Sequence, residues 1–571
     1  MHLKKSAILY LLIPVIFFTG CETKTETADL ILANGKLLLM DKDFSTVDAL
    51  AISGDRIVRV GSNSEILKLR GPQTQFVDLG GRTASPGMIE SHIHFAQLGR
   101  RIRQLFLNDT RSREEAIELV RQKVSTLEEG EWVTGAGWHT ATWDGSDYPD
   151  GKLLNQVTPD NPVYLTGMSW HAAWVNKIVM DMAGIDKNTP DPVGGIIVRN
   201  PETGEPTGVF LETAQKLVET ALPKESDEQL ESIIQGANDA AAAFGITTIH
   251  DAQANDKEIA AYRNLIENER LKIRIYTMYH VDEFGDDFDS LMDKPIEVGS
   301  YDNRLTLRTL KIFSDGALGA RGAALHKPYS DDPTSAGLLR DNPTTINNVI
   351  NKAFNAGYQV AYHAIGDRAN HLVLDAYQKA LESKDASNIR PRIEHAQILS
   401  LDDLPRFGSL GVIASMQPLH FSLDQQFAEA RLGKERMGGA YAWRSLINSD
   451  ARVIFNSDAP FSPVQHSDPL IGIYAADTRR SLDGSLFNEE KDQRLTRREA
   501  IESFTIHPAY AAFEENIKGS LKIGMLADIA VWSNDISQIP AEKLLSTEAV
   551  MTIIGGEIVY DKENLIHISS D

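Results

Sequence analysis

Residues 86–94 read PGMIESHIH, an apolar β-type segment that ends in two histidines, His92 and His94. Side chains two positions apart in a strand point to the same side, so both imidazoles can face one centre. Taken alone, such a pair is more often structural or incidental than a pair of metal ligands. It gains weight because further β-type segments along the chain also end in histidine or aspartate.

Eight β-type segments alternate with helical patterns, which is typical of βα units and a parallel sheet. One helix is well marked: Ser226 and Gln229 predict a capping box at its start, and Gly245 predicts its end. Eight such units that close on themselves predict an α/β fold of the (β/α)8 barrel type. The eight segments are 84–94, 246–251, 273–278, 307–313, 359–363, 391–395, 412–416 and 453–458.

The two ends of the chain share another pattern. Residues 28–84 and 519–571 consist mainly of short β-type segments separated by glycine turns. We therefore expect one small β-sandwich domain built from both ends, around a barrel over residues 85–518.

A long insertion follows the first barrel strand. About 150 residues separate the first two strands, far more than a βα loop needs. This insertion, about 96–243, carries five of the seven tryptophans, and Trp138 and Trp170 are our candidates for substrate contacts. Because long loops often carry function, we interpret it as a lid or pocket wall. The alternative is a packed subdomain that does not touch the substrate.

Composition and charge narrow the class of protein. The chain has 571 residues, of which 42% are hydrophobic and 24% charged, a balance typical of globular proteins. With 80 acidic and 57 basic residues the net charge is -23, which argues against a nucleic-acid partner. The single cysteine, Cys21, excludes a disulfide framework and a cysteine-based zinc site.

The N-terminus has the pattern of a targeting segment. Lys4 and Lys5 precede an apolar run, residues 7–18, that is too short for a membrane span of about 20 residues. Small residues then lead to Cys21, and this arrangement resembles the lipobox of bacterial lipoproteins. The resemblance implies cleavage of a signal peptide, 1–20, and lipidation of Cys21. The alternative is a plain secretory signal with an incidental cysteine.

The lipobox resemblance also implies a location. The protein would lie in the bacterial cell envelope and contact a membrane through its lipid anchor only, with residues 21–27 as a polar tether.

Chemically active side chains stand where the predicted barrel strands end. His363, His395 and Asp458 end the fifth, sixth and eighth segments. The C-terminal ends of barrel strands form the face where barrel active sites lie. Neutral imidazoles and carboxylates are the ligands that zinc and similar divalent ions take. The sequence thus predicts a metal site for a small-molecule substrate.

These motifs carry a family resemblance over nearly the whole chain after residue 28. PGMIESHIH resembles the opening motif of the amidohydrolase superfamily, and the order HxH, Lys, His, His and Asp matches as well. Residues 524–529 resemble the family's return to its β-sandwich. Within the superfamily the chain resembles amidohydrolase family 3, the branch similar to N-substituted formamide deformylase. The matching stretches are 245–252, 311–319, 363–369, 392–397, 416–418 and 457–460.

The resemblance implies a site for one or two divalent ions, which we expect to be zinc. Its ligands would be His92, His94, Lys311, His363, His395 and Asp458. Lys311 would act as a carbamate that bridges two ions, because a free lysine is cationic and cannot ligate. The alternative is an ordinary lysine paired with Asp315.

The resemblance also implies hydrolysis of a C–N bond in an amide, formamide or cyclic amide by a metal-activated water. Asp458 would pass the water's proton to the leaving nitrogen. His171 would lie near the substrate and, like His363, is a candidate for stabilising the oxyanion. Arg368 would bind a substrate carboxylate, with an ion pair to Asp367 or Glu394 as the alternative. His250 ends the second strand, and we assign it no role beyond support.

Two other functions stay open at this level. A lipid-anchored binding or scavenging protein would keep the fold without turnover, and the superfamily also contains deaminases and isomerases. The sequence is compatible with a homo-oligomer.

The lipobox interpretation predicts the behaviour of a Cys21→Ser variant. Because serine cannot be acylated at sulfur, the variant should stay uncleaved by lipoprotein processing or be released from membranes. Fractionation with an acyl label tests this. Unchanged membrane retention with unchanged label would contradict a lipid anchor at Cys21.

Overall fold

The computed structural model describes residues 27–108, 110–139, 143, 148–167, 171–281, 286–460, 464–485 and 493–567. The predicted signal peptide, Cys21 and Trp170 lie outside these ranges. Within them, no helix combines the length and the apolar character that a membrane span requires.

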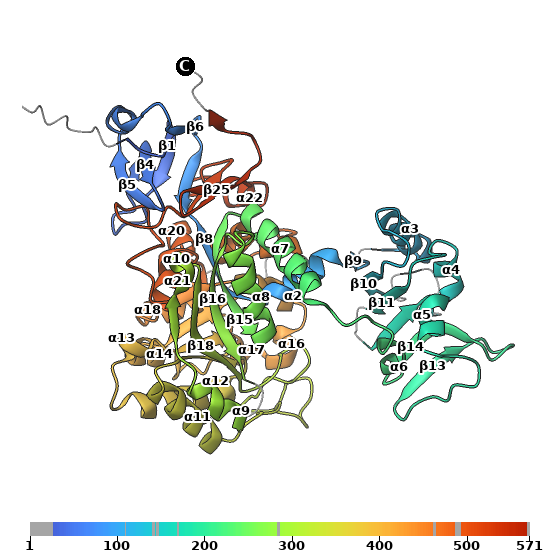
Figure 1. The fold of residues 1–571 in the computed structure, drawn as a ribbon. Coiled ribbons are helices and arrows are strands. Elements are labelled where there is room, and N and C mark those ends of the chain that lie inside the picture. The colour runs from blue at the N-terminus through green and yellow to red at the C-terminus, as the bar shows by residue number, and fades with distance from the viewer. Residues whose placement is uncertain are drawn as a thin grey trace, which may run out of the picture.

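Eight parallel strands form the barrel at the centre of the molecule (Figure 1). Its ends meet where the Asp458 amide donates to the His92 carbonyl (3.1 Å) and the His94 amide donates to the Ala459 carbonyl (2.9 Å). All eight predicted segments form strands, so the predicted (β/α)8 barrel is confirmed. The strands are, in order, β8 (Met88–Ile93), β15 (Ile246–Ala254), β16 (Arg274–His280), β18 (Leu305–Phe313), β19 (Gln359–Ala364), β20 (Arg392–His395), β21 (Ile413–Met416) and β22 (Val453–Phe455).

Amphipathic helices surround the strands. Helix α7 (Asp227–Ala243) begins with the capping box that Ser226 and Gln229 predict, and Gly245 follows its end with a φ of +72°. Helix α2 (Phe95–Arg103) packs on α7 so closely that a Cβ on Gly99 would lie 2.1 Å from the Ile233 carbonyl oxygen. Helices α2 and α7 thus belong to the barrel layer. Other helices between barrel strands are α8 (Asp256–Glu267), α11 (Pro343–Asn355), α12 (Asp367–Leu381), α14 (Leu404–Leu410) and α18 (Trp443–Asn448).

Strands from both chain ends share one sheet, in the order β25-β24-β23-β7-β2-β3. A second sheet, β26-β6-β1-β4-β5, packs with it around an aliphatic core. The strands are β1 (Leu30–Ala33), β2 (Lys36–Leu38), β3 (Thr46–Val47), β4 (Ala49–Ser53), β5 (Arg56–Gly61), β6 (Gln75–Asp78), β7 (Thr83–Pro86), β23 (Ile529–Trp532), β24 (Ala549–Ile554), β25 (Glu557–Asp561) and β26 (Ile566–His567).

The junction between barrel and end domain differs from the prediction in one detail. The segment 84–94 forms two strands, because the chain leaves β7 at Gly87 and enters the barrel as β8. A Cβ on Gly87 would lie 2.1 Å from the Thr247 side chain, so only glycine fits this passage. A buried ion pair joins the same two parts: Arg274 donates to both carboxylate oxygens of Asp528, at 2.7 and 2.9 Å.

The insertion forms a lobe with its own sheet, ordered β13-β14-β12-β11-β10-β9. Figure 1 shows it set beside the barrel, past α2. The rings of Trp138, Trp143 and Trp174 pack on one another with centroids 6.1–6.2 Å apart, in the core of this lobe. Its elements are β9 (Leu105–Phe106), α3 (Arg113–Val124), β10 (Val133–Trp138), α4 (Gly151–Asn155), β11 (Val163–Gly167), β12 (Ala172–Val175), α5 (Lys177–Met182), β13 (Gly195–Arg199), β14 (Pro206–Glu212) and α6 (Gln215–Glu219).

Candidate metal centre

The predicted ligands converge at the C-terminal ends of the barrel strands. One ligand atom each of His92, His395 and Asp458 lies within 4.8 Å of the others. The Oδ1 atom of Asp458 is 3.3 Å from Nε2 of His92 and 3.3 Å from Nε2 of His94. The ring of His363 lies 4.4 Å from that of His395, centroid to centroid. The structure therefore brings all four histidines and the aspartate into one buried cluster.

Lys311 lies at the end of β18, wholly buried, with Nζ 4.1 Å from the centroid of the Phe313 ring. Burial lowers the pKa of Lys311 to about 8, while Asp458 and Glu394 act in the opposite direction. Asp315 instead accepts the amides of Ile365, Gly366 and Ala324. Among the described residues no ion pair joins Lys311 to Asp315, so the structure does not form the alternative pairing.

Several buried polar atoms of the cluster have no hydrogen-bond partner among the described residues: Nε2 of His92, both ring nitrogens of His363, and Oδ1 of Asp458. Buried polar atoms nearly always have partners, because leaving them unpaired is costly. Burial also lowers the pKa of His92 to about 4 and that of His395 to about 3, which keeps both imidazoles in the neutral form that ligates metals. This donor set fits a divalent metal ion.

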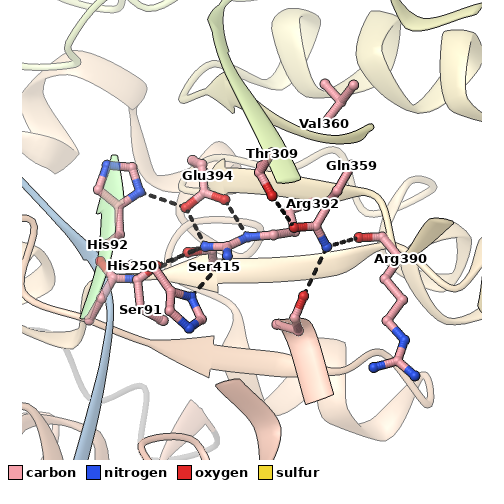
Figure 2. A network of polar contacts seen from close by, with 12 residues as sticks. Ser91, His92, His250, Thr309, Gln359, Val360, Arg390, Arg392, Glu394 and Ser415 are labelled. Atoms are coloured by element: carbon pink, nitrogen blue, oxygen red, sulfur yellow. Dashed lines mark hydrogen bonds and ion pairs between the residues drawn. The ribbon is translucent and has the colours of Figure 1, made fainter. Parts of the chain in front are cut away.

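A buried ion pair between Arg392 and Glu394 orients His92, and Figure 2 shows it beside the His92 ring. Nδ1 of His92 lies 2.5 Å from Oε2 of Glu394, and Arg392 donates to both oxygens of that carboxylate, at 2.8 and 3.1 Å. Burial alone raises the pKa of Glu394, but Arg392 and His92 outweigh it and hold that pKa well below its usual range. Because an ionised carboxylate only accepts hydrogen bonds, Nδ1 of His92 carries the proton and Nε2 is left to ligate.

Two further side chains support the cluster in the same way. His250, which we assigned no role beyond support, lies on β15 with Nδ1 3.1 Å from a guanidinium nitrogen of Arg392. Nδ1 of His395 lies 2.9 Å from Oε1 of Gln417, whose amide nitrogen donates to Asn456. Sequence reasoning missed Glu394 and Gln417 as supports, although both stand inside the motifs that carried the resemblance.

A cavity of about 360 Å³ opens on the cluster. His420, on helix α15 (Pro418–Asp424), also lines it, with Nε2 3.9 Å from Oδ2 of Asp458. Sequence reasoning missed His420 because it follows a strand by several residues instead of ending it. The lining residues are His94, Gln253, Lys311, Phe313, Ala317, Leu318, Gly319, His363, Ile365, His395, Gln397, His420, Leu423, Asp424 and Asp458.

The structure does not bring Arg368 to this cavity. Its side chain is exposed in the first turn of α12, and Glu394 is bonded to Arg392 instead. The structure therefore does not support the expected contact between Arg368 and a substrate carboxylate.

The predicted site residues of the insertion also lie elsewhere. Trp138 is 3% exposed, and its indole donates to the Leu165 carbonyl in the core of the lobe. The side chain of His171 is 68% exposed and pairs with Glu212 at 2.9 Å. Neither lines the cavity, which corrects the expectation that they contact the substrate; the insertion contributes no described residue to the lining. Trp170 lies outside the described residues.

The contact between Glu394 and His92 predicts the effect of a Glu394→Gln variant. Loss of the negative charge removes the strong acceptor for Nδ1 of His92 and leaves Arg392 without its counter-charge. Supporting residues of this kind typically contribute about 10- to 100-fold to metal affinity. We expect a loss of that size in a competition titration with a metal chelator, with an unchanged circular dichroism spectrum as the control for folding. Wild-type metal affinity would show that Glu394 does not orient the ligand.

Comparisons with known proteins agree with this site. The chain matches the sequence model of the amidohydrolase family over residues 75–560. It is 32% identical to Protein LONG AFTER FAR-RED 3 of Arabidopsis thaliana, over 93% of this chain and 92% of that protein. It is 26% identical to N-substituted formamide deformylase of Arthrobacter pascens, over 94% and 99%.

A solved structure, an uncharacterized metal-dependent hydrolase from Pyrococcus horikoshii OT3, matches with a TM-score of 0.73 at 26% identity, over 90% of this chain and 99% of that one. The resemblance to the amidohydrolase family is confirmed. Because the match spans most of the chain and the barrel carries a metal-ligating cluster, the protein belongs to the amidohydrolase family and is a metal-dependent hydrolase.

Proposed function

We propose that the protein hydrolyses a C–N bond in a small amide, formamide or cyclic amide. The observation that carries this proposal is the position of Asp458, a buried carboxylate between the imidazoles of His92 and His94 at the wall of the cavity. The name of one relative, N-substituted formamide deformylase, supports the choice of bond.

The residues of the cluster would hold one or two divalent ions. His92, His94 and Asp458 would bind one ion, and His363 and His395 a second, with Lys311 between them. Zinc suits this set of nitrogen and oxygen donors. When bound, the ion supplies an activated water and polarises the substrate carbonyl.

Lys311 would ligate as a carbamate. Its neutral amine adds to the carbon of carbon dioxide and releases one proton, which yields an anionic group with two oxygens. Burial supports this step, because a pKa of about 8 leaves more neutral amine at neutral pH than an exposed lysine has. A lysine that stayed cationic would be repelled by a divalent ion.

Asp458 would move the proton. Burial alone raises its pKa, but the histidines around it, with His92 the strongest, outweigh burial and hold the pKa well below its usual range. The carboxylate is therefore ionised, and it would accept a proton from the attacking water and pass it to the leaving nitrogen. Of the two histidines expected to stabilise the oxyanion, His363 lines the cavity and His171 does not.

We also propose that the protein works in the bacterial cell envelope as a lipoprotein. This proposal rests on the sequence alone, on the apolar run that ends at Cys21. The folded part would then meet the membrane through the acyl chains and a short tether.

The carbamate predicts a chemical rescue. Lys311→Ala should lose metal and activity, and added acetate or bicarbonate should restore part of the activity, because a small carboxylate can replace the carbamate oxygens. His92→Ala, which lacks an imidazole, should not respond. Metal analysis and turnover with and without the additives provide the test. Full metal content and activity in Lys311→Ala would refute a ligating role for Lys311.

The proton shuttle predicts that Asp458→Asn separates turnover from metal binding. Asparagine keeps the shape but loses the base, and such groups contribute typically about 10²–10⁴-fold to the rate. Most metal should stay bound, because the other ligands remain. Both quantities should be measured on one preparation. Near-normal turnover would assign the proton transfer to another group, whereas loss of metal would make Asp458 primarily a ligand.

A further inference from the structure

Beyond the metal-ligating cluster, the one carboxylate among the described lining residues of the cavity is that of Asp424. No arginine and no second lysine occur among the described lining residues. Much of the remaining wall is apolar, formed by Phe313, Leu318, Ile365 and Leu423. Asp424 is half-buried in this wall, where its carboxylate can meet a bound group of suitable chemistry.

Asp424 is held rigidly through one of its two oxygens. Oδ2 accepts the Tyr441 hydroxyl at 2.6 Å and the Gln397 amide at 2.7 Å. Oδ1 accepts no hydrogen bond from any residue that the structure describes. Burial raises the pKa of Asp424, while His420 and the two hydrogen bonds act against that rise.

The backbone is strained at Tyr441, one of the two residues that hold Asp424. Tyr441 is wholly buried with a φ of +51°, in the left-handed region that residues other than glycine rarely adopt. Its amide donates to the Gln397 carbonyl at 2.8 Å, so the two residues that hold Asp424 are also tied to each other. Strain of this kind persists where the surrounding structure enforces it, and it gathers at ligand sites.

The position of Asp424 on α15 sets its distance from the metal-ligating cluster. It lies four residues after His420 on α15, so the two side chains share one helix face about 6 Å apart. His420 in turn reaches Asp458, at 3.9 Å. A substrate whose reacting carbonyl lies at the cluster would thus place a group about one helical turn further along beside Asp424.

We propose that Asp424 is a substrate-binding residue that selects amides carrying a protonated amine, or a similar cationic N–H donor, and disfavours those carrying a carboxylate. This inference rests on the proposed C–N hydrolysis and adds the substrate class. An ionised carboxylate only accepts hydrogen bonds, and a charge-assisted bond from an ammonium group is roughly twice as strong as a neutral one. A substrate carboxylate would meet like charge here.

Three matched N-formyl compounds test the proposal on the metal-loaded full chain. Each has a spacer of about four carbons, enough to span roughly one helical turn, and they end in a primary amine, a methyl group or a carboxylate. We expect the wild-type kcat/KM to be highest for the amine and lowest for the carboxylate. Equal values for the three compounds would overturn the proposal.

Asp424→Asn keeps an oxygen for Tyr441 and Gln397 but places an N–H donor where Oδ1 stood. The kcat/KM for the amine should fall by about 10- to 100-fold, as expected for loss of a hydrogen bond to a charged group. The methyl compound should change by less than about threefold, since a single neutral contact is worth little. A uniform loss across the three compounds, or no loss, would overturn the proposal.

Two control variants test whether Asp424 selects the substrate or only supports the surrounding structure. Tyr441→Phe loosens Asp424 but keeps its carboxylate, so the preference for the amine should persist. If Tyr441→Phe reproduced the effect of Asp424→Asn, Asp424 would be a structural residue and the proposal would fail. Asp375→Asn changes an exposed carboxylate on α12 that pairs with Arg406, and it should leave all three kcat/KM values unchanged.

Binding measurements keep this test apart from the test of the reaction itself. Calorimetry with n-butylammonium and n-butanol requires no turnover. The ammonium ion should bind the wild type and lose at least about tenfold in affinity in Asp424→Asn, while the alcohol should not distinguish the two proteins. If no formyl compound is hydrolysed but this pattern holds, the proposed reaction is wrong and the cation subsite stands. Equal ammonium affinity in both proteins overturns the subsite.

Discussion

The site depends on a wholly buried ion pair, Arg392 with Glu394, at the centre of the barrel. Burying two charges costs several kcal/mol each, and only good geometry and further hydrogen bonds repay it. Glu394 also accepts a hydrogen bond from Nδ1 of His92, and Arg392 also donates to the Ser91 carbonyl. The same ion pair therefore orients His92, a candidate metal ligand, and neutralises the charges buried in the barrel interior.

The barrel strands and their polar partners position the rest of the cluster in the same way. The candidate ligands stand at or near the ends of five strands, with His92 and His94 both at the end of β8. Neighbouring strands fix their backbones, and one polar partner then sets the ring, as Gln417 does for His395. Apolar burial keeps the imidazoles neutral and the lysine less basic than in water. The described residues of the tryptophan-rich lobe do not line the cavity, and the rings of Trp138, Trp143 and Trp174 pack on one another.

Sequence alone predicted the features that local spacing determines. The eight strands, the capping box at Ser226 and the histidines and aspartate at strand ends follow from periodicity and position. Partners brought together from distant parts of the chain were not visible, as with Glu394 and His92, 302 residues apart. The sequence could not show that Trp138 fills the core of the lobe, because tryptophans that fill a core and tryptophans that line a pocket have the same sequence pattern. The sequence also could not show that Arg368 does not line the cavity, because helix orientation decides whether such a side chain reaches the site.

The end domain carries a consequence for biosynthesis. Strand β7 pairs with β23 on one side, and Arg274 forms its buried ion pair with Asp528, so both contacts form after the last part of the chain is made. Until then a nascent chain exposes the open edge of β7 and an unpaired arginine beneath a barrel that is otherwise complete. Open strand edges recruit other chains. Ribosomes that stall late on this message would thus release products prone to aggregation and suited to recognition by chaperones or proteases.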